Sequence, residues 1–108
     1  MDKNPYNTRI VFNLGWVLLV LGQYSSGIAL MEKCIQLDRA ITPWSKWNIA
    51  CGQAKEGKGQ EALATLREVD AGPLWNLIEK DDWFVDLKAN PTLWQEFLDL
   101  CRDKKRDD

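Results

Sequence analysis

The chain has 108 residues, of which 45% are hydrophobic and 28% are charged, and its formal net charge is −2. This composition is typical of one globular domain and differs from that of disordered segments. A phosphate backbone is bound by a surplus of basic residues, which this chain lacks, so we expect no nucleic-acid partner.

The residue types that carry most catalysis and metal binding are absent or scattered. The sequence has no histidine, which excludes Ser-His-Asp and Cys-His arrangements and the HExxH zinc site. Cys34, Cys51 and Cys101 are odd in number and far apart, which predicts reduced thiols. We expect Asp81 and Asp82 to be solvated surface charge. The sequence therefore predicts no enzyme activity, no cofactor and no metal.

The longest apolar run, residues 10–21, does not predict a membrane span. Asn13 and Gly15 interrupt it, and it reaches about half of the ~20 residues that a spanning helix needs. No basic segment precedes the run and no small-residue cleavage site follows it, so it does not predict a signal peptide. We expect a cytoplasmic protein without a membrane partner.

An internal repeat with a spacing of 35 residues organises the first two thirds of the chain. Small residues align with small ones and large apolar residues with large ones. The aligned positions are 12–15 on 47–50, Gly22 on Gly57, 27–29 on 62–64, Met31 on Leu66, and Cys34 on Val69. Each copy is predicted to form two antiparallel helices, because the turn between them is short.

The first predicted helix has apolar residues at steps of three and four. Its expected core face is Val11, Leu14, Leu18 and Leu21. Gly22 is expected to end this helix in a left-handed conformation.

The second predicted helix should begin at Ser25 or Ser26, which are natural N-cap residues. Its expected core face is Ile28, Met31, Cys34 and Ile35. Helices that cross closely need small residues at the contact, and this predicts two crossing pairs. These pairs are Gly15 with Gly27, and Ala50 with Ala62.

The second copy should open with Thr42 as N-cap and Pro43 at the first helical position. Gly57 and Gly59 flank its turn. The apolar face of its last helix is predicted to be Ala62, Leu63, Leu66 and Val69.

The repeat fades after residue 70, where we expect a C-terminal helical segment. A short helix over Leu74–Glu79 should be followed by a helical turn over Asp82–Leu87 and by a helix that starts at Asn90-Pro91. The apolar face of the last helix is predicted to be Leu93, Trp94, Phe97, Leu98 and Cys101, and Trp75, Trp83 and Trp94 should pack in the core. We expect residues 102–108 to be frayed.

These residues resemble the tetratricopeptide repeat. The resemblance is carried by Asn13-Leu14-Gly15, Gly22-Gln23-Tyr24, Ala29, Met31 and Leu37-Asp38, and again by Asn48-Ile49-Ala50, Gly57, Glu61-Ala62-Leu63 and Leu66. The sequence departs from the family pattern where Val11 and Lys46 replace its first aromatic residue, and where Arg39 replaces its closing proline.

The resemblance implies an all-α fold of antiparallel helical hairpins, stacked as a short right-handed superhelix (an α-α solenoid). It divides a single domain into repeat 1 (8–41), repeat 2 (42–70), a helical cap (71–102) and a tail (103–108). In this family the first helix of each repeat lines a concave groove. The residues so implied are Phe12, Asn13, Trp16, Leu19, Trp47, Asn48 and Cys51, with Ala54 continuing the stripe.

The function implied by the resemblance is a protein–protein interaction module or scaffold with an apolar groove. Its partner would be a protein or peptide, or a second copy in a homodimer. The alternative is a structural repeat segment, or a self-associating module without a separate ligand. The aromatic stripe is equally compatible with core packing, and Asn13 and Asn48 with hydrogen bonds between helices. These alternatives stay open here.

The best-known ligands of the family, acidic C-terminal peptides of heat-shock chaperones, are not expected to bind. Their recognition resembles a carboxylate clamp of Lys, Asn and further basic residues. Phe12 stands where the Lys belongs and Trp16 where the first Asn belongs, and of the clamp residues only Asn48 matches. The segment from Leu74 to Ile78 offers no basic residue. A carboxylate there would lose its water without gaining a charged donor.

Overall fold

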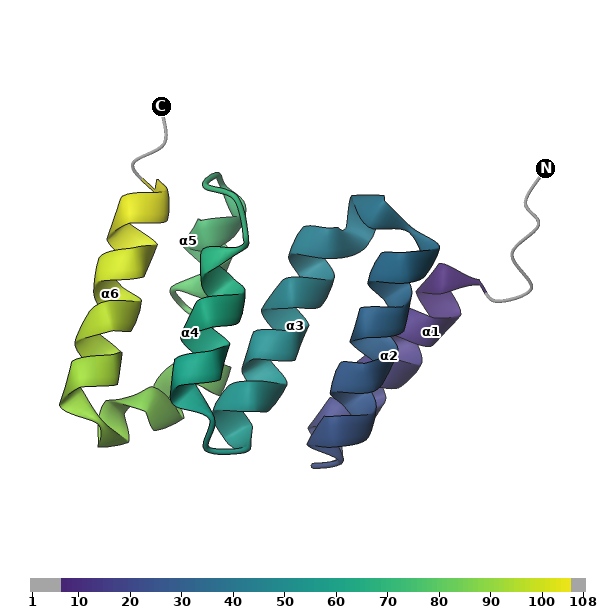
Figure 1. The fold of residues 1–108 in the computed structure, drawn as a ribbon, viewed down its shortest axis with the longest axis horizontal. Coiled ribbons are helices and arrows are strands. Elements are labelled where there is room, and N and C mark those ends of the chain that lie inside the picture. Colours follow the sequence, from purple (N-terminus) through teal and green to yellow (C-terminus); the bar gives the residue numbers. More distant parts are fainter. Residues whose placement is uncertain (1–6, 106–108) are drawn as a thin grey trace.

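The computed structural model describes residues 7–105, and every regular element in this range is helical (Figure 1). The elements are α1 (Thr8–Val20), α2 (Tyr24–Leu37), η1 (Arg39–Ile41), α3 (Thr42–Lys55), α4 (Gly59–Arg67), α5 (Leu74–Ile78), η2 (Asp82–Ala89) and α6 (Pro91–Lys105). Because residues 7–105 contain no strand, the prediction of an all-α protein is confirmed.

Helices that follow one another in the chain also pack on one another. α1 packs on α2, α2 on α3 and α3 on α4, while α6 packs against α4, α5 and η2. Figure 1 shows α1 behind α2 and α5 behind α4, with the last helix closing the far end. In this order α1 and α3 come into contact, and η2, from the C-terminal part of the chain, also packs against α3.

Two turns that are 35 residues apart have the same geometry. Gly22 and Gly57 have φ of 86° and 81°, a left-handed conformation that L side chains rarely adopt. In each turn the residue after the glycine donates its N–H to a carbonyl one turn back in the preceding helix. These bonds join Gln23 to Leu18 at 2.8 Å and Lys58 to Gln53 at 2.9 Å. Both are Schellman caps, so the predicted helix end at Gly22 is confirmed.

Glycines let α1 and α2 approach closely. A Cβ atom on Gly27 would lie 2.7 Å from Leu19 Cγ and 2.9 Å from the Gly15 carbonyl oxygen, and real side chains do not make such contacts. Gly15 itself is buried against Met31. The predicted contact between Gly15 and Gly27 is therefore confirmed. Ala50 and Ala62, the equivalent pair in α3 and α4, are fully buried.

The core has two parts that meet at one tryptophan. The smaller part is Leu19, Met31 and Ile49, between α1, α2 and α3. The larger part joins α3 to the C-terminal elements and includes Ala50, Cys51, Ala54, Ala62, Leu63, Leu66, Val69, Trp75, Ile78, Phe84, Leu87, Phe97 and Cys101. Trp83 is half-buried and packs against both parts. The predicted core faces of α4 and α6 and the burial of Trp75 are confirmed, although Leu98 is exposed.

The predicted core face of α1 is wrong. Leu14 and Leu21 are 51% and 65% exposed, and Val11 and Leu18 are only half-buried. The helix instead buries Gly15 and Leu19, because at the crossing Gly15 packs against Met31 and Leu30 of α2 and Leu19 packs against Gly27. The predicted face of α2 holds, since Met31 and Cys34 are buried and Ile28 and Ile35 are half-buried.

Two predicted helix caps are displaced. α2 begins at Tyr24 with Gln23 in the N-cap position, so Ser25 and Ser26 lie inside its first turn. The carbonyl of Gln23 already accepts the first helical bond, from Gly27 N–H at 3.0 Å, so the helix begins before either serine. Thr42 lies within α3, where its hydroxyl donates to the carbonyl of Arg39 at 2.7 Å.

The C-terminal segment follows the prediction more closely. α5, η2 and α6 lie where the short helix, the helical turn and the last helix were expected, and the Asn90 side chain accepts from Thr92 N–H at 3.0 Å. Residues 102–105 are not frayed, since α6 continues to Lys105 and Lys105 pairs with Glu79 at 2.6 Å. The rest of the expected frayed tail, residues 106–108, lies outside the described residues.

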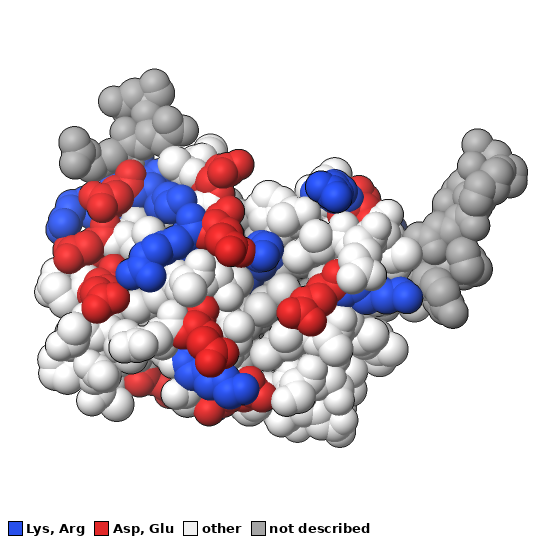
Figure 2. Space-filling model, in the orientation of Figure 1, with Lys and Arg blue, Asp and Glu red and all other residues white. Residues whose placement is uncertain are grey.

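Charged side chains of both signs are mixed over the face that α2, α4 and α6 present (Figure 2). No large area of one sign appears on this face. The lower right end of the same view, where the α1–α2 turn lies, shows no charged residue.

Candidate functional site: an aromatic cavity between α1, α3 and Asp81

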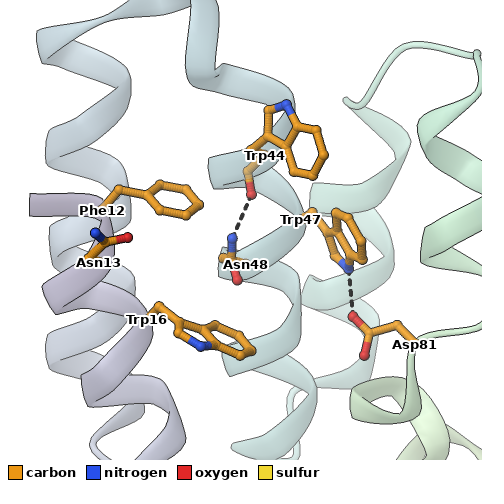
Figure 3. Close-up of a pocket in the computed structure, with 7 residues that line it drawn as sticks. All are labelled: Phe12, Asn13, Trp16, Trp44, Trp47, Asn48 and Asp81. Atoms are coloured by element: carbon orange, nitrogen blue, oxygen red, sulfur yellow. Dashed lines mark hydrogen bonds between the residues drawn. The ribbon is translucent and has the colours of Figure 1, made fainter. Parts of the chain in front are cut away.

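A cavity of about 260 Å³ opens between α1, α3 and the residue before η2 (Figure 3). α1 and α3 present their side chains to it at steps of three and four residues, as one helical face requires. The lining residues are Phe12, Asn13, Trp16, Trp44, Trp47, Asn48 and Asp81.

Four aromatic rings form most of the wall. Figure 3 shows Phe12 on one side and Trp47 on the other, with Trp44 above and Trp16 below. Trp44 and Trp47 are stacked with ring centroids 5.8 Å apart. The ring centroid of Trp16 lies 5.2 Å from that of Trp83, which does not line the cavity. Trp16 and Trp44 remain 38% and 46% exposed. The site is thus an open aromatic surface rather than a filled core.

The carboxylate of Asp81 is held in place by three donors. Oδ1 accepts from Trp83 N–H at 2.9 Å, which makes Asp81 the N-cap of η2. Oδ2 accepts from the Trp47 indole N–H at 2.7 Å and from the Cys51 thiol at 3.5 Å. The aspartate therefore fixes the orientation of Trp47 and places a negative charge on the cavity wall.

That negative charge has no ion-pair partner among residues 7–105. Neither Lys nor Arg lines the cavity. Lys55 lies nearby, but it pairs with Asp86 at 3.3 Å and sits 5.8 Å from the ring centroid of Trp83. The pKa of the Cys51 thiol is raised well above its ordinary value by burial and then by the charge of Asp81.

The two asparagines differ in their bonding. Asn48 donates through its side-chain nitrogen to the carbonyl of Trp44 at 2.9 Å, a bond within α3. Figure 3 shows the Asn48 amide on α3, between Trp44 and Trp16. Asn13 is exposed at the rim.

Five of the seven residues predicted for the groove line this cavity together, namely Phe12, Asn13, Trp16, Trp47 and Asn48. The other two, Leu19 and Cys51, are only 1% exposed. Leu19 faces Gly27 and Gly52 at the close approach of α2 and α3, and Cys51 faces inward against Asp81. Their predicted placement in the groove is therefore wrong, and Cys51 is as buried as Cys34. Ala54 is also buried.

Sequence reasoning missed Trp44 and Asp81. Trp44 lies three residues before Trp47, so the shared helical face was a usable signal. Asp81 was expected to be solvated surface charge, which describes its exposed neighbour Asp82 but not Asp81 itself. Only the return of the chain after α5 brings Asp81 to α3.

None of the helices in the described part of the chain is both long and apolar enough to cross a bilayer. The same residues contain no cluster of three or more His, Cys, Asp or Glu side chains that would hold a metal ion. Comparison with protein-family models, with curated proteins and with solved structures finds no match for this chain.

Proposed function

We propose that this chain is a protein-interaction module of the tetratricopeptide type, which binds a segment of a partner protein in the aromatic cavity. The repeat interpretation is supported by the two Schellman turns at Gly22 and Gly57. It is also supported by the small buried residues at both helix crossings. Both features recur at the spacing of 35 residues on which the resemblance was based.

The observation that carries the proposal is the group of aromatic side chains left open to solvent around one cavity. Trp16 and Trp44 keep more than a third of their surface exposed while facing a shared space. Large aromatic side chains are the usual anchors of protein interfaces, because they bury much area at little entropic cost. An extended peptide or one face of a helix would supply the apolar side chains that fill the cavity.

The test is a titration with two peptides, one rich in apolar residues and one with an acidic tail, followed by tryptophan fluorescence. We expect the apolar-rich peptide to bind and the acidic one to bind weakly, since the cavity offers a carboxylate and no basic group. Trp16→Ala should weaken the binding of the apolar-rich peptide. The control Leu77→Ala, at an exposed site on α5, should leave that binding unchanged. Micromolar binding of the acidic peptide that survives Trp16→Ala would contradict the proposal.

A second candidate function, self-association, is favoured by the outer face of α1. Ile10, Leu14, Val17, Val20 and Leu21 are between 47% and 65% exposed. Together they present on the order of 500 Å² of apolar surface, a size at which exposed patches mark interaction sites. We call these five residues the α1 stripe. None of the five residues lines the aromatic cavity, but Val17 and Val20 follow Asn13 and Trp16 by four residues, so the stripe borders the rim of the cavity.

The α1 stripe is suited to a second copy of itself. Ile10, Leu14, Val17 and Leu21 follow at steps of four, three and four residues, a pattern that reads alike in both directions. Two antiparallel copies would set Leu14 against Val17 and Ile10 against Leu21, as a two-fold axis requires. Arg9 is the one charged residue of α1, so the face offers a charged partner little to pair with. The dimer would bury about 1,000 Å² in total, the lower end for specific interfaces.

Sedimentation over a range of concentrations tests the dimer. We expect a reversible, concentration-dependent dimer that Leu14→Glu disperses, because the charge would be buried against its copy. Leu77→Glu is the matched control, since Leu77 is 53% exposed on α5. A protein that is monomeric at all concentrations, or a dimer that Leu14→Glu leaves intact, would contradict this candidate.

A further inference from the structure

The aromatic cavity combines two features that a purely apolar groove does not need. One is the carboxylate of Asp81, which is fixed on the wall by Trp47, Trp83 and Cys51. The other is a set of four rings around the same space. A carboxylate can accept about four hydrogen bonds, so the three donors do not saturate it. A partly buried carboxylate without an ion-pair partner, in a cavity that no Lys or Arg lines, favours a positively charged ligand.

The rings favour the same ligand. The face of an aromatic ring carries partial negative charge and attracts a cation within about 6 Å of its centroid, with tryptophan the strongest of the three ring types. Three of the four rings here are tryptophans, Trp16, Trp44 and Trp47. Trp44 and Trp47 are stacked with ring centroids 5.8 Å apart, and Phe12 and Trp16 line the same space from α1.

The groups in the cavity favour an alkylated cation over a primary ammonium. A lysine ammonium has three N–H donors and a strongly held water shell, and it needs acceptors to replace that water. The acceptors that the cavity offers are the carboxylate of Asp81, which already accepts from three donors, and the amide oxygens of Asn13 and Asn48. A quaternary ammonium has no donors to satisfy, keeps its charge and presents methyl groups to the rings. It therefore loses less on leaving water.

The size of the cavity points to one side chain rather than a whole small molecule. Its volume of about 260 Å³ is below the range of about 300–1,000 Å³ that is usual for sites of drug-sized ligands. The open rim at Trp16 and Trp44 leaves space for a peptide backbone to pass outside while one side chain enters.

We propose that the cavity is an aromatic box for a quaternary ammonium group, carried by a trimethylated lysine side chain of the partner. This inference rests on the proposed function, because the groove supplies the surface on which the rest of the partner lies. Phe12, Trp16, Trp44 and Trp47 surround the methyl groups, and Asp81 provides the opposite charge.

Four small probes test the box by the shifts of the indole N–H signals in NMR spectra. The probes are N-acetyl-trimethyllysine methylamide, its neutral analogue with carbon in place of the ammonium nitrogen, the unmethylated lysine derivative, and choline. We expect the trimethyllysine derivative to bind at least tenfold more tightly than the neutral analogue and the lysine derivative. Choline should bind no more tightly than the trimethyllysine derivative.

Variants assign the preference to the box. Asp81→Asn removes the charge and keeps one acceptor oxygen, which can serve either Trp83 N–H or the Trp47 indole, so trimethyllysine binding should weaken about tenfold and binding of the neutral analogue should weaken much less. Asp82→Asn removes one negative charge at the exposed neighbouring position. It should leave the binding of the trimethyllysine derivative and of the neutral analogue unchanged. If Asp81→Asn does not fold, Trp44 gives an independent series at a half-exposed position, with affinity falling from Trp to Phe to Leu.

The outcomes separate this inference from the proposed function. Equal binding of the trimethyllysine derivative and its neutral analogue would overturn the cation preference, while binding of the apolar-rich peptide would still support the groove. Choline binding that is tenfold tighter than that of trimethyllysine would overturn the side-chain source. If the apolar-rich peptide binds and none of the four probes shifts an indole signal, the box is wrong and the groove stands. If the peptide also fails to bind, both are wrong.

Discussion

At the scale of single residues, the hydroxyl of Ser45 is a source of instability in α3. Ser45 is fully buried, and its Oγ has no hydrogen-bond partner among the described residues. An unsatisfied buried hydroxyl costs roughly 1–3 kcal/mol, so Ser45→Ala should raise the free energy of unfolding by about 1 kcal/mol or more. Urea denaturation of the two proteins measures this difference in the free energy of unfolding.

The control for Ser45→Ala is Ser26→Ala, at an exposed position in α2. Alanine has a higher helix propensity than serine at both positions, so Ser26→Ala measures the part of the stabilisation that comes from propensity alone. If the two substitutions stabilise equally, the hydroxyl of Ser45 is satisfied in solution and the burial argument is wrong.

The three thiols make stability depend on alkaline pH. Burial raises the pKa of Cys34 and of Cys51, and burial together with Glu79 raises the pKa of Cys101 to about 12. A raised folded-state pKa favours the neutral thiol, so the stabilisation is complete below the ordinary pKa of 9.0 and falls between about pH 9 and 12.

Cys101→Ala should therefore lose less stability between pH 9 and 11 than the natural chain, as measured by thermal unfolding. At neutral pH a thiol reagent should modify all three cysteines only as fast as the protein unfolds. Rapid modification of Cys51 in the folded protein would show that its contact with Asp81 is not maintained.

The candidate site shows what single residues reveal in a sequence. Trp47 and Asn48 were found because they repeat Phe12 and Asn13 at the same helical positions. Asp81 was not found, because it lies outside the repeat and its neighbour Asp82 has the same chemistry but is exposed. The helical positions of Trp47 and Asn48 were enough to predict them, whereas Asp81 reaches the site through a contact between segments that are far apart in sequence.

At the scale of the helices, the closest packing lies where α1 and α2 cross. Gly27→Leu should lower the free energy of unfolding by about 1–3 kcal/mol or more, because even a Cβ atom would meet the backbone of Gly15. Ala62→Leu should act similarly between α3 and α4.

The matched controls are Ala29→Leu and Ala64→Leu, at exposed positions of α2 and α4. These should change stability by less than about 0.5 kcal/mol, as is usual for surface positions. Denaturation midpoints for Gly27→Leu and Ala62→Leu that match those of the controls would show that the helices do not cross there.

The error in the face of α1 has a physical cause. The helix carries apolar residues on nearly every side, so its periodicity does not fix which side is buried. The contact of Gly15 with α2 fixes it instead, and this turns Leu14 and Leu21 outward. α4 is more amphipathic, and its predicted face of Ala62, Leu63 and Leu66 is buried. Sequence predicts the buried face of a helix well only when its opposite face is polar.

At the scale of the whole molecule, the two parts of the core meet at Trp83, on the C-terminal side of the aromatic cavity. The C-terminal segment thus supplies both Trp83 behind Trp16 and Asp81 on the wall of the cavity. The repeat spacing predicted the order of the helices from residue 8 to residue 70. It did not predict that the segment after the repeats completes the site, because that depends on packing between segments far apart in sequence.

The central claim is that the aromatic cavity binds a partner segment, and the most direct test selects short peptides from a random library against the folded protein. We expect the selected peptides to share an apolar or alkylated cationic anchor and to lose binding to Trp16→Ala and Trp44→Ala. Leu77→Ala and Leu14→Glu should bind them as the natural chain does. Peptides that bind the two tryptophan variants as tightly as the natural chain, or whose binding depends on Leu14 instead, would show that the aromatic cavity is not the binding site.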